Sequence, residues 1–191
     1  MELKNALADI LEKEHALNRE EIEIICSYFC PEDLNKEDVL LMAGNVYKKI
    51  VFVVEGILRL YVIDPNGEEV VKNFIEPGCF FSDMESFDNN HCATFNVSAV
   101  TDCKILTLSK PDKNRLVSQV PKWDYMMKQG AMQAMSDMIR KQEFLRIGDS
   151  SDQYQHFVKH FPLLAQQVPL KYIASYLRIT QSSLSRIRRK H

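Results

Sequence analysis

The side chains best suited to an intermolecular contact lie near the end of the chain. A cluster of basic residues, Arg186, Arg188, Arg189 and Lys190, follows Gln181 and a run of hydroxyl residues. Guanidinium and ammonium groups bind phosphate oxygens, and arginine or glutamine side chains can form paired hydrogen bonds with guanine or adenine. The residue types of this segment therefore favour a nucleic acid as its partner.

Spacing places these residues on the second of two short helices. Apolar residues recur at helical spacing on both sides of a break at residues 178–180, and they are Ile173, Ala174, Leu177, Leu184 and Ile187. Thr180 suits the N-cap of a helix that begins at Gln181. The pattern resembles a helix-turn-helix, whose second helix lies in the major groove of DNA. A solvated amphipathic helix pair is the alternative. Arg178 occupies a turn position where such motifs often have glycine, and a left-handed conformation there costs about 1 kcal/mol.

Charge is unevenly distributed along the chain. The formal net charge is −2 at pH 7, but no acidic residue follows Asp152, and seven lysines and arginines give residues 153–191 a charge of +7. Residues 1–152 consequently carry −9. An acidic body with a basic end is the distribution expected of a protein that carries a nucleic-acid-binding module.

Length and composition indicate a globular protein. The 191 residues, 46% of them hydrophobic, suffice for one large domain or two small ones with a buried core. The sequence has no apolar run of about 18 residues and no signal-peptide pattern after Met1, so we predict a cytoplasmic protein without a membrane partner. Five cysteines show no disulfide framework. Cys26 and Cys30 would share one helix face, but two thiolates do not complete a four-coordinate site, and no metal is predicted.

Before the basic end, the pattern of apolar residues changes from helical spacing to short strand-like runs. Residues 3–11 predict a helix, and Asn18 with Glu21 predicts a capping box for a second helix that ends before Pro31. Short β-branched and aromatic runs follow, separated by glycine and proline, at residues 39–41, 50–54, 57–63, 70–75, 95–100 and 104–108. They predict a β-barrel or jelly roll. Residues 80–94 are irregular, and we expect a ligand pocket there.

A long helix is predicted at about residues 122–147. Its apolar seam has the spacing of a coiled coil and comprises Trp123, Met127, Ala131, Ala134, Met138 and Leu145. This seam predicts a homodimer, although it would also suit a helix that covers the barrel of its own chain. Residues 148–152 are polar and turn-rich, and they predict a linker before the terminal helices.

Three motifs in this order carry a family resemblance. They are residues 53–61, Val-Val-Glu-Gly-Ile-Leu-Arg-Leu-Tyr, the Pro77-Gly78 turn leading to residues 81–87, Phe-Ser-Asp-Met-Glu-Ser-Phe, and residues 173–177 with 184–187 of the terminal helices. Over essentially its whole length the chain resembles the Crp/Fnr family of bacterial transcription regulators, relatives of the cyclic-AMP receptor protein. The resemblance implies an α+β fold: a cyclic nucleotide-binding-like β-barrel (jelly-roll) sensor domain at residues 1–120, a dimerisation helix at 121–147 and a reduced helix-turn-helix domain at 148–191.

The resemblance also implies roles for residues of the terminal helices. Gln181, Ser182 and Arg186 fall on the positions that read bases. Phosphate contacts are expected from Lys171, Thr180, Ser183, Arg188, Arg189 and Lys190. The implied protein is an effector-responsive, DNA-binding homodimer that reads a pseudo-palindromic operator and works with RNA polymerase.

In the resemblance, the effector pocket comprises Ser82, Asp83, Met84, Glu85, Ala93 and Thr94. Relatives that bind cyclic nucleotides use a Gly-Glu turn and an Arg-Ser pair, whose arginine neutralises the cyclic phosphate. Here the pair falls on Ala93 and Thr94. A buried phosphate without a cation pays a desolvation cost of several kcal/mol, so cyclic AMP is not expected to bind and the effector is unknown. Lys104 or Arg59 would be the candidates to replace the missing arginine.

Two other classes of protein are alternatives. An enzyme of the cupin type would need clustered histidine ligands, but the predicted barrel contains only His91, so we predict that the protein is not an enzyme. A sensor or protein-interaction module that has lost DNA binding is the second alternative, because the family's β wing is missing after the last helix.

Overall fold

The computed structural model describes residues 2–13, 17–144 and 148–190. The described helices are α1 (Glu2–Glu12), α2 (Arg19–Tyr28), α3 (Met84–Asn89), α4 (Lys110–Gln119), α5 (Lys122–Phe144), α6 (Ser150–His160), α7 (Pro162–Gln167), α8 (Leu170–Leu177) and α9 (Gln181–Lys190). The strands are β1 (Cys30–Leu34), β2 (Val39–Leu41), β3 (Lys49–Glu55), β4 (Leu58–Ile63), β5 (Glu69–Ile75), β6 (Phe80–Phe81), β7 (Asn96–Ala99) and β8 (Cys103–Ser109). This mixture of helix and antiparallel sheet confirms the predicted fold class.

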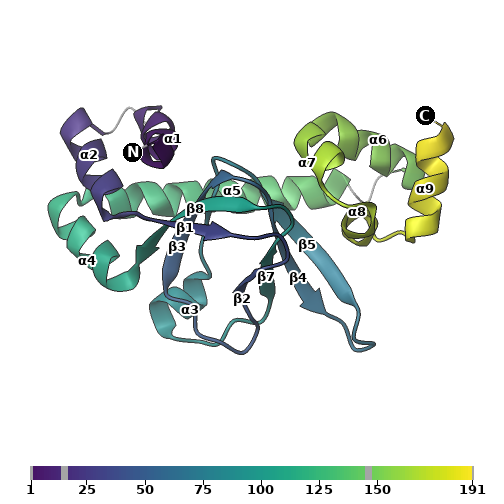
Figure 1. Cartoon of the computed structure of the whole chain (residues 1–191), viewed down its shortest axis with the longest axis horizontal. Coiled ribbons are helices and arrows are strands. Elements are labelled where there is room, and N and C mark those ends of the chain that lie inside the picture. Colours follow the sequence, from purple (N-terminus) through teal and green to yellow (C-terminus); the bar gives the residue numbers. More distant parts are fainter. Residues whose placement is uncertain (1, 14–16, 145–147, 191) are drawn as a thin grey trace. The chain divides into compact units, whose positions relative to one another are not determined.

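The strands form two four-stranded sheets. One has the order β1-β8-β3-β6 and the other β2-β7-β4-β5. In the first sheet β8 pairs antiparallel with both β1 and β3, and the three strands lie side by side in Figure 1. Helix α1 contacts β3 and β8. Each sheet therefore brings together segments that are far apart in the sequence.

Alternate residues of the central strands enter two different cores. On β3, Phe52 belongs to a core shared with α1, α2 and α4, whereas Val51 and Val53 belong to a core that includes residues of both sheets. On β8, Leu106 joins the first core and Ile105 the second. The period of two in side-chain direction explains why these strands are apolar throughout their length.

Local sequence signals define where several helices begin. The side chain of Asn18 accepts the Glu21 N–H at 2.9 Å, and the Glu21 carboxylate accepts the Asn18 N–H at 2.8 Å, so the predicted capping box is confirmed. The same backbone hydrogen bond from Asn18 is the main cause that lowers the pKa of Glu21, with Lys122 as the second. Ser109 caps α4 by accepting the Asp112 N–H.

Gly56 allows the turn between β3 and β4. Its φ is +88°, and a Cβ atom at this position would lie 2.3 Å from the carbonyl oxygen of Asp102. Only glycine avoids both the strained backbone and the collision. This turn brings β4 back towards the second sheet.

Two elements depart from the sequence-based prediction. α2 ends at Tyr28, before Pro31, as predicted, but Pro31 lies in a strand that was not predicted, β1, opposite Leu106. β1 is an edge strand, where a residue without an N–H is tolerated. Residues 80–94 are not irregular throughout, since they contain β6 and the short helix α3. Asp83 begins α3 by accepting the Ser86 N–H at 3.2 Å.

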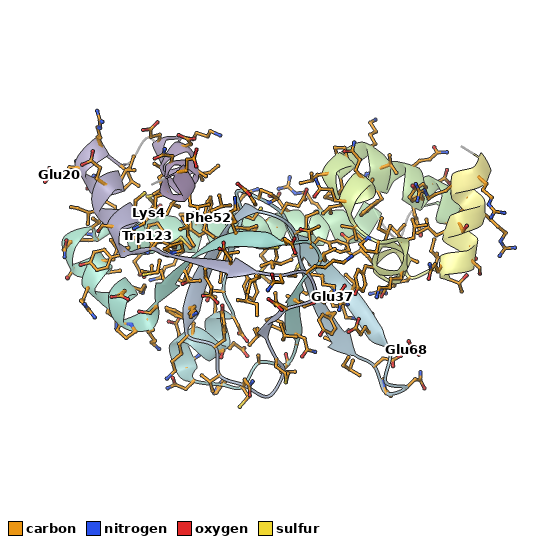
Figure 2. All side chains as sticks on the ribbon, in the orientation of Figure 1. Lys4, Glu20, Glu37, Phe52, Glu68 and Trp123 are labelled. Carbon is orange, nitrogen blue, oxygen red and sulfur yellow. The ribbon has the colours of Figure 1, made fainter. Side chains whose placement is uncertain are left out.

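The first residue of the predicted dimer seam packs within its own chain. Trp123 is fully buried, and its ring meets the edges of Phe29 and Phe80 at centroid distances of 5.9 Å. Figure 2 shows Trp123 near Phe52, which belongs to the same core. Trp123 therefore offers no surface to a partner, and for this end of α5 the alternative, in which the helix covers its own barrel, is correct. Leu145, the last residue of the seam, lies outside the described residues.

The chain divides into two compact units. The first comprises Met1–Leu60 and Phe74–Lys128, and the second comprises Tyr61–Asn73 and Gln129–His191. Most of the sheet residues and the start of α5 thus belong to the first unit, and the rest of α5, helices α6 to α9 and the tip of the β4–β5 hairpin belong to the second. No helix in the described ranges is long and apolar enough to cross a membrane.

Candidate nucleic-acid interface and ligand pocket

Helices α8 and α9 are joined by a tight turn at residues 178–180. Arg178 has φ 57° and ψ 36°, so it does adopt the left-handed conformation that the sequence left open. The Arg178 N–H donates to the carbonyl of Ser175, and the Ile179 N–H donates to that of Ala174 at 3.0 Å. These bonds satisfy carbonyl groups at the end of α8 and reverse the chain direction.

Thr180 starts α9, as predicted. Its hydroxyl accepts the Ser183 N–H at 3.1 Å, and its carbonyl accepts the Leu184 N–H at 3.0 Å. The same hydroxyl lies 3.0 Å from that of Ser182. The first turn of α9 is therefore fixed by side-chain hydrogen bonds as well as by its own backbone.

An apolar core holds α9 against the other helices of the second unit. Leu184 and Ile173 are fully buried, Ala174 and Leu177 nearly so, and α8 contacts both α6 and α9. Phe157 of α6 is also fully buried. Helices α6 and α8 thus position α9 from one side.

The rest of α9 is largely exposed and basic. Gln181, Ser182 and Arg186, the predicted base-reading residues, are all exposed, as are Arg188 and Arg189. Arg189 follows Ser182 by seven residues, so it shares a helix face with Ser182 and Arg186, whereas Arg188 does not. The sequence-based prediction treated Arg188 and Arg189 alike. In the part of the chain that the structure describes, no carboxylate forms an ion pair with Arg186, Arg188 or Arg189.

The remaining predicted phosphate contacts differ in their surroundings. Ser183 is half-buried, and its hydroxyl accepts from Thr180 at 2.9 Å and from Arg186 at 3.4 Å. Lys171 is exposed, with its ammonium 4.5 Å from the centroid of the Tyr172 ring. Lys190 is the last residue of α9.

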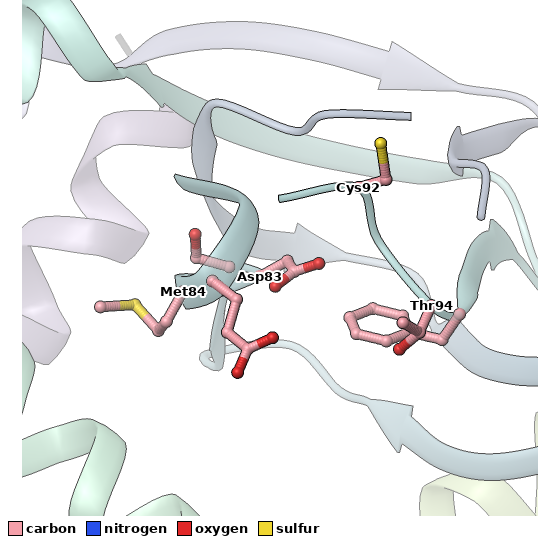
Figure 3. Close-up of a pocket in the computed structure, with 7 residues that line it drawn as sticks. Asp83, Met84, Cys92 and Thr94 are labelled. Carbon is pink, nitrogen blue, oxygen red and sulfur yellow. The ribbon is translucent and has the colours of Figure 1, made fainter. Parts of the chain in front are cut away.

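A pocket of about 290 Å³ lies where the sequence predicted one. Five of the six predicted residues line it, namely Ser82, Asp83, Met84, Glu85 and Thr94, and Cys92 and Phe95 complete the lining (Figure 3). Ala93 does not reach the pocket, because its side chain is only 4% exposed and belongs to the core that includes residues of both sheets. Cys92 and Phe95 were missed because the family resemblance assigned the pocket positions to Ala93 and Thr94, which lie between them.

The lining of the pocket is acidic and partly structural. Asp83 is 8% exposed and caps α3, and the hydroxyl of Ser82 donates to the carbonyl of Lys49 at 3.2 Å. Glu85 adds a second carboxylate. No lysine, arginine or histidine is among the described residues that line the pocket. The pocket thus offers hydrogen-bond acceptors and hydroxyl groups, and an anion placed in it would meet like charge.

The two cations considered as substitutes for the missing arginine are engaged elsewhere. Arg59 is buried, donates through Nε to the Ser98 hydroxyl at 3.0 Å and lies 3.9 Å from the Glu37 carboxylate. Lys104 forms a 2.9 Å ion pair with Glu55 on the first sheet. Neither side chain lines the pocket.

Cys26 and Cys30 do not share a helix face. Cys26 is buried on α2, where burial raises the pKa of its thiol, whereas Cys30 is exposed at the start of β1 because α2 has already ended at Tyr28. Cys103 is also buried, and burial raises its pKa in the same way. Among the described residues no group of three or more histidine, cysteine or acidic side chains is placed to hold a metal ion.

The second half of α5 carries an exposed apolar surface. Met132, Met135, Met138 and Ile139 are between 38% and 66% exposed. Ala131 and Ala134 of the predicted seam are exposed as well, whereas Met127 is partly buried against the core that contains Trp123. The described part of the seam is therefore divided between the chain's own core and an uncovered face.

Residues 31–120 match the family model of the cyclic nucleotide-binding domain. No curated protein sequence matches the chain. Among solved structures, FixK2 from Bradyrhizobium japonicum has a TM-score of 0.72 at 13% identity, over 85% of this chain and 83% of that one. CLP, a c-di-GMP-responsive global regulator of Xanthomonas campestris, has a TM-score of 0.69 at 16% identity, over 91% of each chain. The catabolite activator protein of Thermus thermophilus has a TM-score of 0.59 at 18% identity, over 92% of this chain and 84% of that one.

Proposed function

We propose that the protein is a sequence-specific, DNA-binding transcription regulator. Its match to the cyclic nucleotide-binding domain at residues 31–120 and the fold it shares with Crp/Fnr-type regulators support this proposal. The observation that carries the proposal is the exposed basic face of α9, fixed by the turn at residues 178–180 and backed by α6 and α8. A short helix held rigidly from one side and basic on the other is suited to the major groove.

The residues of α9 divide into two roles. Gln181, Ser182 and Arg186 lie at the exposed surface and read bases, with Arg186 donating paired hydrogen bonds to guanine. Phosphate groups are held by Arg188, Arg189 and Lys190, and by Lys171, Thr180 and Ser183 near the turn. The N-terminal N–H groups of α9 add a favourable field for a phosphate beside Thr180.

A second copy of the chain covers the exposed face of α5. Met132, Met135, Met138 and Ile139 would together remove a large apolar area from water, and Ala131 and Ala134 permit close approach of a partner helix. A symmetric pair places two α9 helices on successive major grooves and explains why a pseudo-palindromic operator is expected. The interface proposed here therefore omits Trp123 and adds Met132, Met135 and Ile139.

The pocket is the effector site in this proposal. Its two carboxylates and lack of a lining cation disfavour a cyclic nucleotide, whose phosphate would be desolvated without a counter-charge. A small molecule that donates hydrogen bonds fits the lining better. Occupancy shifts the population of arrangements in which the two α9 helices match the operator, and the protein acts through contact with RNA polymerase in the cytoplasm.

Selection of bound DNA from a random pool tests the proposal directly. We expect a two-fold symmetric consensus whose affinity falls steeply with added salt. Arg186→Ala should lose about 1–3 kcal/mol at one position of the consensus, whereas Arg188→Ala should weaken binding to all sequences alike and reduce the salt slope by about one.

Arg19→Ala is the matched control, because Arg19 is an exposed arginine of the first unit that pairs with Glu23. It should leave DNA binding unchanged. If no consensus emerges and residual binding is independent of Arg186, the protein is a sensor or interaction module without DNA-binding function.

A further inference from the structure

A single serine of α8 meets the edge of the β4–β5 hairpin. The hydroxyl of Ser175 accepts the Val71 N–H at 3.0 Å and donates to the carbonyl of Glu69 at 3.1 Å. The partners are more than 100 residues away in the sequence, yet they belong to the same compact unit. One side chain thus forms two hydrogen bonds with the backbone of a distant strand.

The two backbone groups are those that an edge strand leaves unpaired. β5 is the last strand of the order β2-β7-β4-β5, and in an extended strand the C=O of one residue and the N–H two residues later point to the same side. A neighbouring strand would normally bind this pair. Ser175 occupies that place with one hydroxyl that both accepts and donates.

The hairpin that presents this edge is itself well defined. The Asp64 carboxylate accepts the N–H groups of Asn66 and Glu68, both at 2.9 Å, and Gly67 takes a φ of +85° in the turn. Backbone hydrogen bonds, with that of Glu68 the largest cause, lower the pKa of Asp64. Val71 is only 3% exposed. Ser175 therefore binds a fixed edge and not a loose loop.

The hydroxyl of Ser175 bonds a distant strand and not its own helix. A serine inside a helix commonly returns its hydroxyl to the carbonyl four residues earlier. Ser175 instead bonds the hairpin, while its neighbours Ala174 and Tyr176 are buried in the unit. Because α8 also ends in the turn that starts α9, a fixed α8 means a fixed α9.

We propose that Ser175 is a positioning residue, which locks α8 to the hairpin edge and thereby holds α9 in the orientation required for its operator. The DNA-binding part of this inference rests on the proposed function, whereas the lock itself does not. Loss of the lock increases the conformational freedom that α9 must give up when it binds its operator. It does not change the ability of α9 to contact phosphates without sequence preference.

Hydrogen exchange in the full-length protein tests the lock. Ser175→Ala should accelerate exchange of the Val71 amide by about fivefold or more, as expected when one net hydrogen bond is lost. Ser175→Thr, which keeps the hydroxyl, should restore protection. Ser118→Ala is the matched control, since Ser118 is a helix serine that bonds only the nearby carbonyl of Arg115. Unchanged protection of Val71 in Ser175→Ala would overturn the inference.

Binding measurements test the consequence. Ser175→Ala should weaken binding to the selected operator by about fivefold and leave binding to random DNA unchanged, so that the specificity ratio falls. Equal or tighter operator binding would show that the contact does not position α9. If the Val71 amide loses protection in Ser175→Ala but neither the wild-type protein nor this variant binds any DNA, the inference about the lock holds and the proposed function fails.

Discussion

Replacement of Arg178 by glycine should raise the free energy of unfolding. Arg178 has φ 57° and ψ 36°, a region in which a side chain costs about 1–2 kcal/mol and glycine costs nothing. Glycine also lowers the free energy of unfolding by about 0.5–1 kcal/mol, because it increases the conformational entropy of the unfolded chain. The Arg178 N–H bond to the end of α8 does not depend on the side chain. The expected net stabilisation is therefore about 0.5–1 kcal/mol.

Urea denaturation of three proteins separates backbone strain from charge. Arg178→Ala removes the exposed guanidinium but keeps a Cβ atom in the left-handed conformation, so it should unfold close to the wild-type midpoint. With a slope of about 2–3 kcal/mol per molar urea, Arg178→Gly should unfold at a midpoint about 0.2–0.4 M higher than Arg178→Ala. Equal midpoints for the glycine and alanine variants would show that the backbone at this position stores no strain.

Two further predictions concern the pocket and α5. Isothermal calorimetry with the full-length protein should detect no cyclic AMP binding in the micromolar range, because no cation lines the described pocket and a buried phosphate would remain uncompensated; micromolar affinity would contradict this account. Met135→Asp should weaken self-association by at least about tenfold in sedimentation experiments, since it places two carboxylates in a symmetric interface, whereas Gln133→Asp on the opposite side of α5 should not; equal association of both variants would place the interface elsewhere.

The two cores explain why the sheets were predictable and the edges were not. Phe52 and Val53 both lie on β3 and enter different cores, so the strand is apolar throughout and stands out in the sequence. Pro31 carries the opposite signal, since it is disfavoured in most strands. It lies in β1 because the unpaired side of an edge strand needs no N–H, and that position in the sheet is a tertiary fact that local sequence does not reveal.

The seam of α5 shows a different limit of sequence reasoning. Spacing identified a helix and an apolar face, but periodicity does not say which surface the face meets. Trp123 meets Phe29 and Phe80 of its own chain, whereas Met135 and Ile139 remain exposed. Ser175 is a case where the sequence holds no signal at all, because its partners on β5 are defined only by the folded sheet.

The buried position of Ala93 limits how the pocket can be related to a phosphate site. Its N–H donates to the carbonyl of Asn45 at 2.9 Å and its carbonyl accepts from Gly44 at 2.8 Å, while its methyl group lies in a core that includes residues of both sheets. An arginine at this position would have to leave that core. Asp83 begins α3 by capping the Ser86 N–H. The acidity that disfavours a phosphate is therefore partly a consequence of how α3 is folded, and it would persist if the arginine alone were supplied.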